Sequence, residues 1–432
     1  MSKNIKAKDD GGLRKKFFTT ILIIIAYRFV TYVPLPFIDP AKIAEFSSLV
    51  KNGVFGMFNM LSGGSIARIS VLTLGIMPYI TSSIIIQLLS ASSESLKKLK
   101  QEGESGQKKI NNYMRYLTIG ISLFQGFMMA TGFVNMGLYT GYYILYFKLY
   151  SAFVMMVGTV FLLWLSDVCT AKGIGNGTSI IICASILAEA PRDLMNVLHL
   201  SKSGSISPLM LLALFAIFIA TIVFVVFAER SNRLVTIQYP RQAYSFMGKM
   251  DDASKHNFLP LKLNAPGVIP PIFASAILLF PATIASVSDI GKTSSIGIFL
   301  ATQLTHGKPL FVVCYTFLII FFCFFYNNVI FEVDDISNNL KKSGVFIPGY
   351  RPGAATSALL RKILNKLALV GAIYLSIVCM VPELLSPYFG YSFLLGGTGV
   401  LIVVNVIIDT MIGIQTQVMY AKYYKNMGKK SF

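Results

Sequence analysis

Residues 53–90 read GVFGMFNMLSGGSIARISVLTLGIMPYITSSIIIQLLS, and this stretch decides the architecture of the chain. Its second half, Val71 to Leu89, is apolar and long enough to cross a bilayer, yet Pro78 interrupts it. Its first half contains the run SGGS at 62–65, followed by Arg68. Polar or non-helical backbone survives at membrane depth only where protein buries it or water reaches it. The stretch therefore predicts a short re-entrant segment and a kinked helix that lines a cavity. A single imperfect transmembrane helix after a glycine-rich loop is the alternative.

The composition is that of a polytopic membrane protein. Of the 432 residues, 54% are hydrophobic and only 13% are charged. Lys and Arg number 38 against 19 Asp and Glu, an excess that would suggest nucleic acid on a soluble domain. In a membrane protein the placement of these charges in loops matters more than their number. The five cysteines and three histidines are scattered without metal-ligand spacing, so we expect no metal and no cofactor. We also expect no specific nucleic-acid sequence as a ligand.

Ten apolar segments are predicted to span the membrane. They are residues 17–33, 71–89, 116–133, 151–165, 179–190, 209–227, 266–287, 310–331, 363–381 and 391–414. When loops are assigned alternately to the two sides, most Lys and Arg fall on the side of both termini. The positive-inside rule therefore predicts that both termini are cytoplasmic.

The ten segments divide into two sets of five, joined by a polar stretch at 191–207 that we expect to be a flexible linker. An odd number of spans in each half predicts halves that are inverted relative to each other, with a cavity between them. The expected fold is thus an all-α polytopic membrane protein with ten transmembrane helices in two pseudo-symmetric inverted halves, 1–200 and 201–432.

Three functional classes compete for such a chain. An ion-coupled transporter usually holds ionisable residues at mid-membrane, but the span interiors are nearly free of charge. Asp167 and Asp409 lie toward the cytoplasmic ends of their spans, and Arg28 lies near an outer end, where it is expected to snorkel. The sequence has no HExxH, GxSxG or Walker-type motif that would indicate a membrane enzyme or an ATPase. Composition leaves a gated pore and a secondary transporter of small solutes as alternatives.

Six motifs resemble the SecY family, the large channel subunits of bacterial protein translocases, and they occur in the same order over nearly the whole chain. They are FNMLSGGSIARISVLTLGIMPYITSSIIIQLL (58–89), EGESGQKKINNYMRY (102–116), KGIGNGTSIII (172–182), LPLKLNAPGVIPPIFASAILLFPATIA (259–285), NNLKKSGVFIPGYRPG (338–353) and GGTGVLIVVNVIIDT (396–410).

The resemblance implies an hourglass pore with a re-entrant plug, and no enzymatic activity. Such a channel passes unfolded secretory polypeptides across the bacterial plasma (inner) membrane and releases transmembrane segments into lipid through a lateral gate. A separate motor ATPase or the ribosome would drive it. The implied partners are the small membrane subunits SecE and SecG, the motor SecA, the ribosome, secretory preproteins with their signal sequences, and the lipid bilayer. A secondary transporter of small solutes remains the runner-up.

The same resemblance implies four groups of functional residues. The pore ring would consist of Ile76, Ile80, Ile182, Ile186, Ile272 and Ile402. The plug would consist of Met60, Leu61, Ser62, Gly63, Gly64, Ser65, Ile66, Ala67, Arg68, Ile69 and Ser70. The lateral gate would carry Gln87 and Asn264. The basic loops 229–262 and 332–362 would dock the motor or the ribosome through Arg351, Arg230, Arg233, Arg241 and Lys249.

Each assignment has a physical expectation and a plainer alternative. An apolar ring blocks ions by dewetting, although the six isoleucines are equally consistent with ordinary core positions. Gly63 and Gly64 are expected to make the plug mobile. Gln87 and Asn264 are expected to hydrogen-bond across the gate, while Gln87 alone would also suit the end of a helix. The basic residues of the loops would also suit a solvated face.

Overall fold

The computed structural model describes residues 11–39, 42–43, 46–47, 59–139, 141–202, 204, 207–238, 257–264, 266–287, 303, 308–330, 333–389 and 396–429. Within these ranges, ten helices have 16 residues or more. They are α1 (Gly11–Val30), α4 (Met77–Ser92), α6 (Glu104–Asn135), α7 (Ile144–Lys172), α8 (Gly177–Lys202), α9 (Pro208–Arg230), α11 (Ile269–Val287), α14 (Pro309–Ile330), α16 (Ala354–Phe389) and α17 (Gly396–Lys429). Each predicted span overlaps one of them, so the all-α architecture is confirmed.

Apolar surface identifies these helices as membrane-embedded. Among the described residues, six helices are long and apolar enough to cross a bilayer, and α4 and α11 contain shorter apolar helices. Only 11% of the most apolar window of α9 is buried inside the protein, against 56% for α16. A helix that is apolar on every face and yet uncovered by protein requires lipid around it.

The second span begins later than the sequence predicts. Residues 62–76 form a series of turns, and α4 starts at Met77 with Pro78 in its first turn. Proline is tolerated there because the first-turn amides have no partner within the helix, so Pro78 starts a helix and does not kink one. The expected kinked helix is therefore wrong, and the turn segment before it is longer.

The stretch 191–207 is also more ordered than predicted. Helix α8 continues through Pro191 to Lys202, so most of the expected flexible linker is helical. Val197 packs with Leu214 of α9 in a small apolar cluster. Tertiary packing thus compensates for the backbone hydrogen bond that Pro191 cannot donate.

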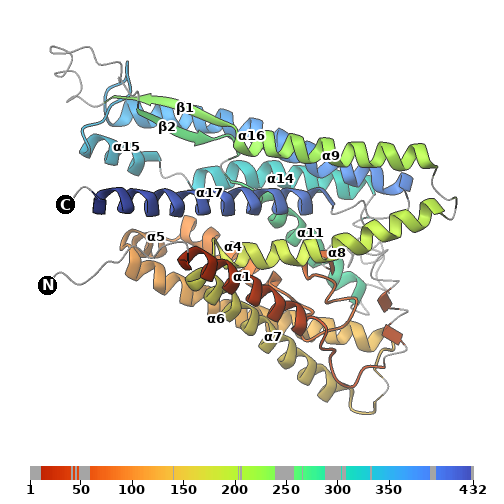
Figure 1. The fold of residues 1–432 in the computed structure, drawn as a ribbon. Coiled ribbons are helices and arrows are strands. Elements are labelled where there is room, and N and C mark those ends of the chain that lie inside the picture. Colours follow the sequence, from red (N-terminus) through yellow and green to blue (C-terminus); the bar gives the residue numbers. More distant parts are fainter. Residues whose placement is uncertain are drawn as a thin grey trace, which may run out of the picture.

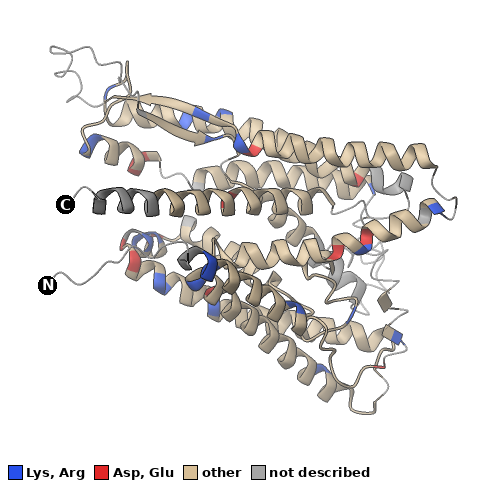
Figure 2. Cartoon of the chain, in the orientation of Figure 1, with Lys and Arg blue, Asp and Glu red and all other residues tan. Residues whose placement is uncertain are grey.

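The two sets of helices occupy two sides of the molecule (Figure 1). Helices α1 to α7 lie on one side, α9, α14 and α16 lie on the other, and α8, α11 and α17 lie between them. The start of α1 and the end of α17 lie at one end, together with α5 (Glu94–Gln101), α15 (Val333–Lys342) and the hairpin of β1 (Asn232–Ile237) and β2 (Asn257–Lys262). Figure 2 shows Lys and Arg concentrated at that end.

The hairpin is part of a small folded unit at that end. The two strands pair antiparallel, from Asn232 opposite Lys262 to Ile237 opposite Asn257. Their inner side chains share an apolar cluster with residues of α15 and α16. The described parts of the two basic loops therefore pack together against the start of α16.

Candidate functional site

The six predicted ring isoleucines belong to one hydrophobic cluster. They come from the start of α4, from α8, from α11 and from α17. Ile76, Ile186, Ile272 and Ile402 are buried, and Ile80 and Ile182 are half-buried against them. The amide of Ile80 donates to the carbonyl of Ile76 over 3.1 Å, so the two follow each other on one helical turn. The cluster contains many other apolar side chains, so burial alone does not single out these six.

The predicted plug is a compact, self-bonded run of turns. The amide of Ala67 donates to Oδ1 of Asn59 over 2.8 Å, and Oγ of Ser65 donates to the carbonyl of Ser62 over 2.8 Å. Ser70 closes the segment through a β-bridge to Pro34. Within the predicted plug, all residues except Met60 and Arg68 are buried. The segment therefore holds its shape through its own polar groups.

Helix α1 binds this segment from one side. Nη1 of Arg28 donates to the carbonyl of Gly63 over 3.0 Å. The hydroxyl of Tyr27 donates to the carbonyl of Ser62 over 3.2 Å and lies 2.6 Å from Oγ of Ser185 on α8. Arg28 was expected to snorkel to the membrane surface, and that expectation is wrong, because its guanidinium turns inward to the plug.

A buried carboxylate on α8 holds the other side. Glu189 is only 6% exposed, and its two carboxylate oxygens lie 3.6 Å from Nη2 of Arg68 and 3.6 Å from Nη1 of Arg192. Nη2 of Arg68 also donates to the carbonyl of Gly63 over 2.6 Å, and its guanidinium lies 4.4 Å from the ring centroid of Tyr32. Charge-assisted contacts of this kind are stronger than neutral ones.

Sequence reasoning missed Glu189, although it lies inside the predicted fifth span. An acidic residue within an apolar span is itself a signal of function, because its burial is expensive. The expectation that the span interiors are nearly free of charge therefore does not hold at Glu189.

The two plug glycines have a role different from the one predicted. Both adopt left-handed backbone, with φ of +67° at Gly63 and +79° at Gly64. A Cβ at Gly64 would lie 2.0 Å from Oε1 of Glu189, and one at Gly63 would lie 2.8 Å from the hydroxyl of Tyr27. The absence of a side chain at both positions allows the segment to approach α1 and α8 closely. The glycines thus serve close packing, whereas the sequence suggested mobility.

The expected amide pair across the gate is absent. Asn264 is buried and donates to Oε1 of Glu229 over 2.7 Å and to the carbonyl of Gly267 over 3.1 Å. Gln87 instead accepts a short hydrogen bond from the hydroxyl of Tyr326 on α14, and its amide donates to Oγ of Ser83 over 3.0 Å. The polar contact between the two sides is therefore Gln87 to Tyr326.

Aromatic packing surrounds that contact. Ile84 of α4, Phe273 of α11, and Phe322 and Tyr326 of α14 form one buried cluster. The Phe273 ring packs edge-on against the rings of Phe322 and Tyr326, with centroids 5.8 and 5.5 Å apart. Among the described residues, the seam between α4 and the pair α11 and α14 is thus mainly apolar, and it includes the amide–hydroxyl contact of Gln87 and Tyr326.

The predicted docking residues fall into two groups. Arg230, Arg233 and Arg351 are exposed at the end of the molecule that carries both termini. Arg241 and Lys249 lie outside the described residues. Arg351 follows Gly349 and precedes Gly353, both with positive φ, in a turn held to α15 by a hydrogen bond from Oγ of Ser337 to the carbonyl of Gly353.

Within the described part of the chain, no group of three or more His, Cys, Asp or Glu side chains could hold a metal ion. The arrangement consists of an apolar cluster at the centre, a polar segment seated beside it, and an apolar seam between α4 and the pair α11 and α14.

Comparisons with known proteins agree with this arrangement. The family model described as SecY matches residues 70–411. The protein translocase subunit SecY of Rickettsia conorii is 42% identical over 433 residues, which cover 99% of each chain. Among solved structures, a protein-conducting channel superposes with a TM-score of 0.69 at 17% identity, over 98% of this chain and 95% of that one.

A second solved structure is the channel in the canine ribosome–channel complex from the endoplasmic reticulum. It superposes with a TM-score of 0.63 at 17% identity, over 98% of this chain and 95% of that one. At 17% identity the two solved structures show the fold alone. The family model and the bacterial relative show the family and its activity. The chain therefore belongs to the SecY family of protein-conducting channel subunits, and it is neither a small-solute transporter nor an enzyme.

Proposed function

We propose that the central isoleucines, the plug and the α4–α14 seam are the working parts of this channel. The observation that carries the proposal is their contiguity. Met60 and Leu61 of the plug pack on the same apolar cluster that contains all six ring isoleucines. One structural unit thus joins the constriction to the segment that would close it.

The ring would work through the absence of polar atoms. An apolar constriction excludes water and ions when it is empty. Isoleucine side chains contact a translocating segment through dispersion forces, which are individually weak and have no directional requirement. The ring would therefore close around any side chain without binding one sequence tightly.

The seam would open toward lipid. Opening the seam breaks the hydrogen bond between Gln87 and Tyr326. This costs on the order of 1 kcal/mol, the size of a side-chain hydrogen bond between membrane helices. An apolar signal sequence would offset part of this cost by packing against the aromatic cluster. The halves 1–200 and 201–432 would separate along this seam.

The proposed orientation places both termini in the cytoplasm of a bacterial cell, in its plasma membrane. The concentration of Lys and Arg at the terminal end supports it (Figure 2). SecE and SecG would accompany the chain in the membrane, and SecA or the ribosome would dock on the exposed hairpin and the turn at Arg351. The ribosome as a partner is supported by the canine complex of similar fold.

The test is reconstitution. Vesicles containing the chain with its copurified small subunits should take up a secretory preprotein when a soluble motor ATPase and ATP are added. Uptake of a small solute by the chain alone, without preprotein transport, would contradict the proposal.

The docking role of Arg351 has its own test. The charge reversal Arg351→Glu should reduce ATP-driven preprotein uptake at least about tenfold, because it removes one charge-assisted contact and adds a repulsive one. The matched control is Lys342→Glu, the same reversal at an exposed position of α15 outside this turn. Equal loss in both variants would assign the effect to the general charge of the face.

A further inference from the structure

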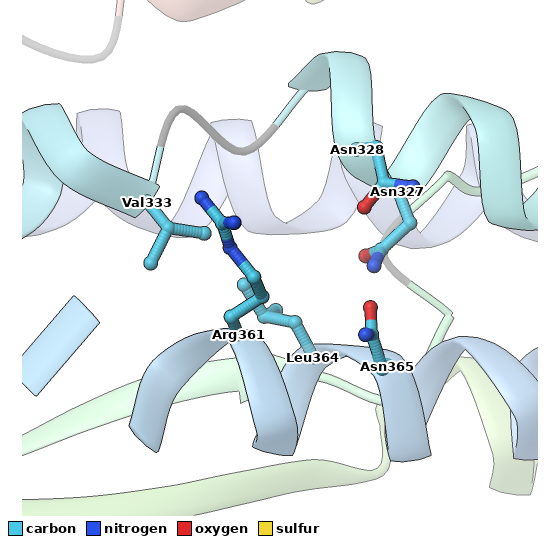
Figure 3. Close-up of a pocket in the computed structure, with 6 residues that line it drawn as sticks. All are labelled: Asn327, Asn328, Val333, Arg361, Leu364 and Asn365. Atoms are coloured by element: carbon cyan, nitrogen blue, oxygen red, sulfur yellow. The ribbon is translucent and has the colours of Figure 1, made fainter. Parts of the chain in front are cut away.

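A polar pocket lies between α14, α15 and α16, and none of its lining residues belongs to the ring, the plug or the seam cluster. Its volume is about 330 Å³, at the lower end of the range for small-molecule sites. Figure 3 shows its lining, with the Asn327 and Asn365 amides facing each other and the Arg361 guanidinium extending toward Val333. The lining residues are Asn327, Asn328, Val333, Arg361, Leu364 and Asn365.

The pocket contains one buried amide. Asn327 is only 3% exposed, and within the described part of the chain its side chain makes no hydrogen bond. Asn328 and Asn365, which also line the pocket, are exposed. Buried polar groups are nearly always hydrogen-bonded, and an amide offers two donors and an acceptor. Asn327 can therefore bind a polar group that enters the pocket.

The charges at its rim are paired. Nη2 of Arg361 lies 3.4 Å from Oδ2 of Asp334, the second residue of α15. An anion alone would meet Arg361 but would be repelled by Asp334. A ligand with both an anionic oxygen and an ammonium group would satisfy both side chains. The rim thus favours a zwitterion.

The pocket lies where polar surface gives way to apolar surface. The exposed stripe of α16 is polar at Arg361 and Asn365 and becomes apolar one turn later. Its apolar members are Leu369, Val370, Ile373 and Ile377. On α14, the apolar run from Pro309 ends at Asn327. This transition is the level of lipid headgroups, and the apolar stripe beyond it would accompany acyl chains.

We propose that this pocket binds a phospholipid whose headgroup carries a phosphodiester and a primary amine, as in phosphatidylethanolamine. The phosphodiester oxygens accept from Arg361 and from the amides of Asn327 and Asn365. The ammonium group donates to Asp334. The lipid is thereby held beside the unit formed by the hairpin, α15 and the start of α16.

The test is native mass spectrometry of the full chain, purified with its associated subunits. Phosphatidylethanolamine, phosphatidylcholine and phosphatidylglycerol with identical acyl chains are titrated, and bound lipid is counted. Phosphatidylethanolamine should bind best, since phosphatidylcholine has no N–H donors and phosphatidylglycerol has no amine. Arg361→Ala should weaken its binding about tenfold. Lys362→Ala, which removes a neighbouring charge outside the pocket, should change binding less than about twofold.

Two further variants separate binding from folding. Asn365 is exposed on α16, so Asn365→Ala should leave the helix at least as stable while it weakens lipid binding. Asp334→Asn should narrow the preference for phosphatidylethanolamine over phosphatidylglycerol. Soluble phosphoethanolamine should displace the lipid poorly, because it has no acyl chains.

Four outcomes would overturn the proposal. They are equal binding of phosphatidylethanolamine and phosphatidylcholine, a preference for phosphatidylglycerol, unchanged binding in the pocket variants, and displacement by soluble phosphoethanolamine at the same concentration as lipid. A photoreactive group at position 365 that captures the translocating polypeptide in place of lipid would assign the pocket to peptide and also overturn it.

Discussion

The proposed plug and the proposed isoleucine ring touch each other but are built from opposite chemistry. The plug is seated by directed contacts, in which Tyr27, Arg28 and Glu189 each meet one particular group. The ring residues are held by apolar packing alone. Directed contacts define one resting position, because they are lost when the geometry changes. Undirected contacts tolerate many shapes. A seal that returns to one place and a constriction that fits any chain thus require different side chains.

The largest expected effect comes from disturbing the seat of the plug. The variant Gly64→Ala would strain left-handed backbone by about 1–2 kcal/mol and would force Glu189 aside. The plug should then leave its seat, and ion leakage through resting vesicles should rise at least about tenfold. Conductance of reconstituted planar bilayers measures this directly.

A matched glycine controls for backbone strain. Gly103 has φ of +78°, nearly the same as Gly64, but a Cβ there would meet nothing within 4 Å. Gly103→Ala should therefore leave the resting leak unchanged. Tight bilayers with Gly64→Ala would show that the contact with Glu189 does not hold the plug.

An intermediate effect is expected from placing a polar group in the ring. Ile402→Asn would bury an amide at a cost of about 1–3 kcal/mol in the closed channel, whereas an open and hydrated channel would accommodate it. The variant should export a reporter with a defective signal sequence, assayed by the fraction that crosses the membrane. Ile402→Leu keeps the ring apolar and should not. Equal export by both variants would show that the size of the side chain, and not its apolar character, keeps the channel closed.

The smallest effect is expected at the seam. Tyr326→Phe removes the hydroxyl that Gln87 accepts from, which is worth about 0.6 kcal/mol on average between membrane helices. Cross-linking of a signal peptide to α4 should rise about threefold. Tyr315→Phe is the control on the same helix, because the Tyr315 hydroxyl has no hydrogen-bond partner among the described residues. A similar rise in both variants would exclude a role for the Gln87 contact.

Much of the architecture follows from composition and periodicity. Apolar length predicts each of the ten helices, since a bilayer requires about 20 apolar residues and leaves no alternative to a helix. The distribution of Lys and Arg predicts which loops share an end, and Figure 2 agrees. The ring isoleucines came from resemblance to a family, since nothing in the spacing of isoleucines separates them from the rest of the core.

Partners across the molecule depend on tertiary packing. A helical repeat predicts which side chains share a face, but not which residue lies opposite. Gln87 meets Tyr326, 239 positions away, and not Asn264, because α14 lies against α4 while Asn264 turns to the end of α9. Glu189 likewise contacts Arg68, which lies in a distant part of the sequence. The sequence suggests that Gly63 and Gly64 belong to a loop. Only the tertiary structure shows that α1 and α8 approach them so closely that a Cβ has no room.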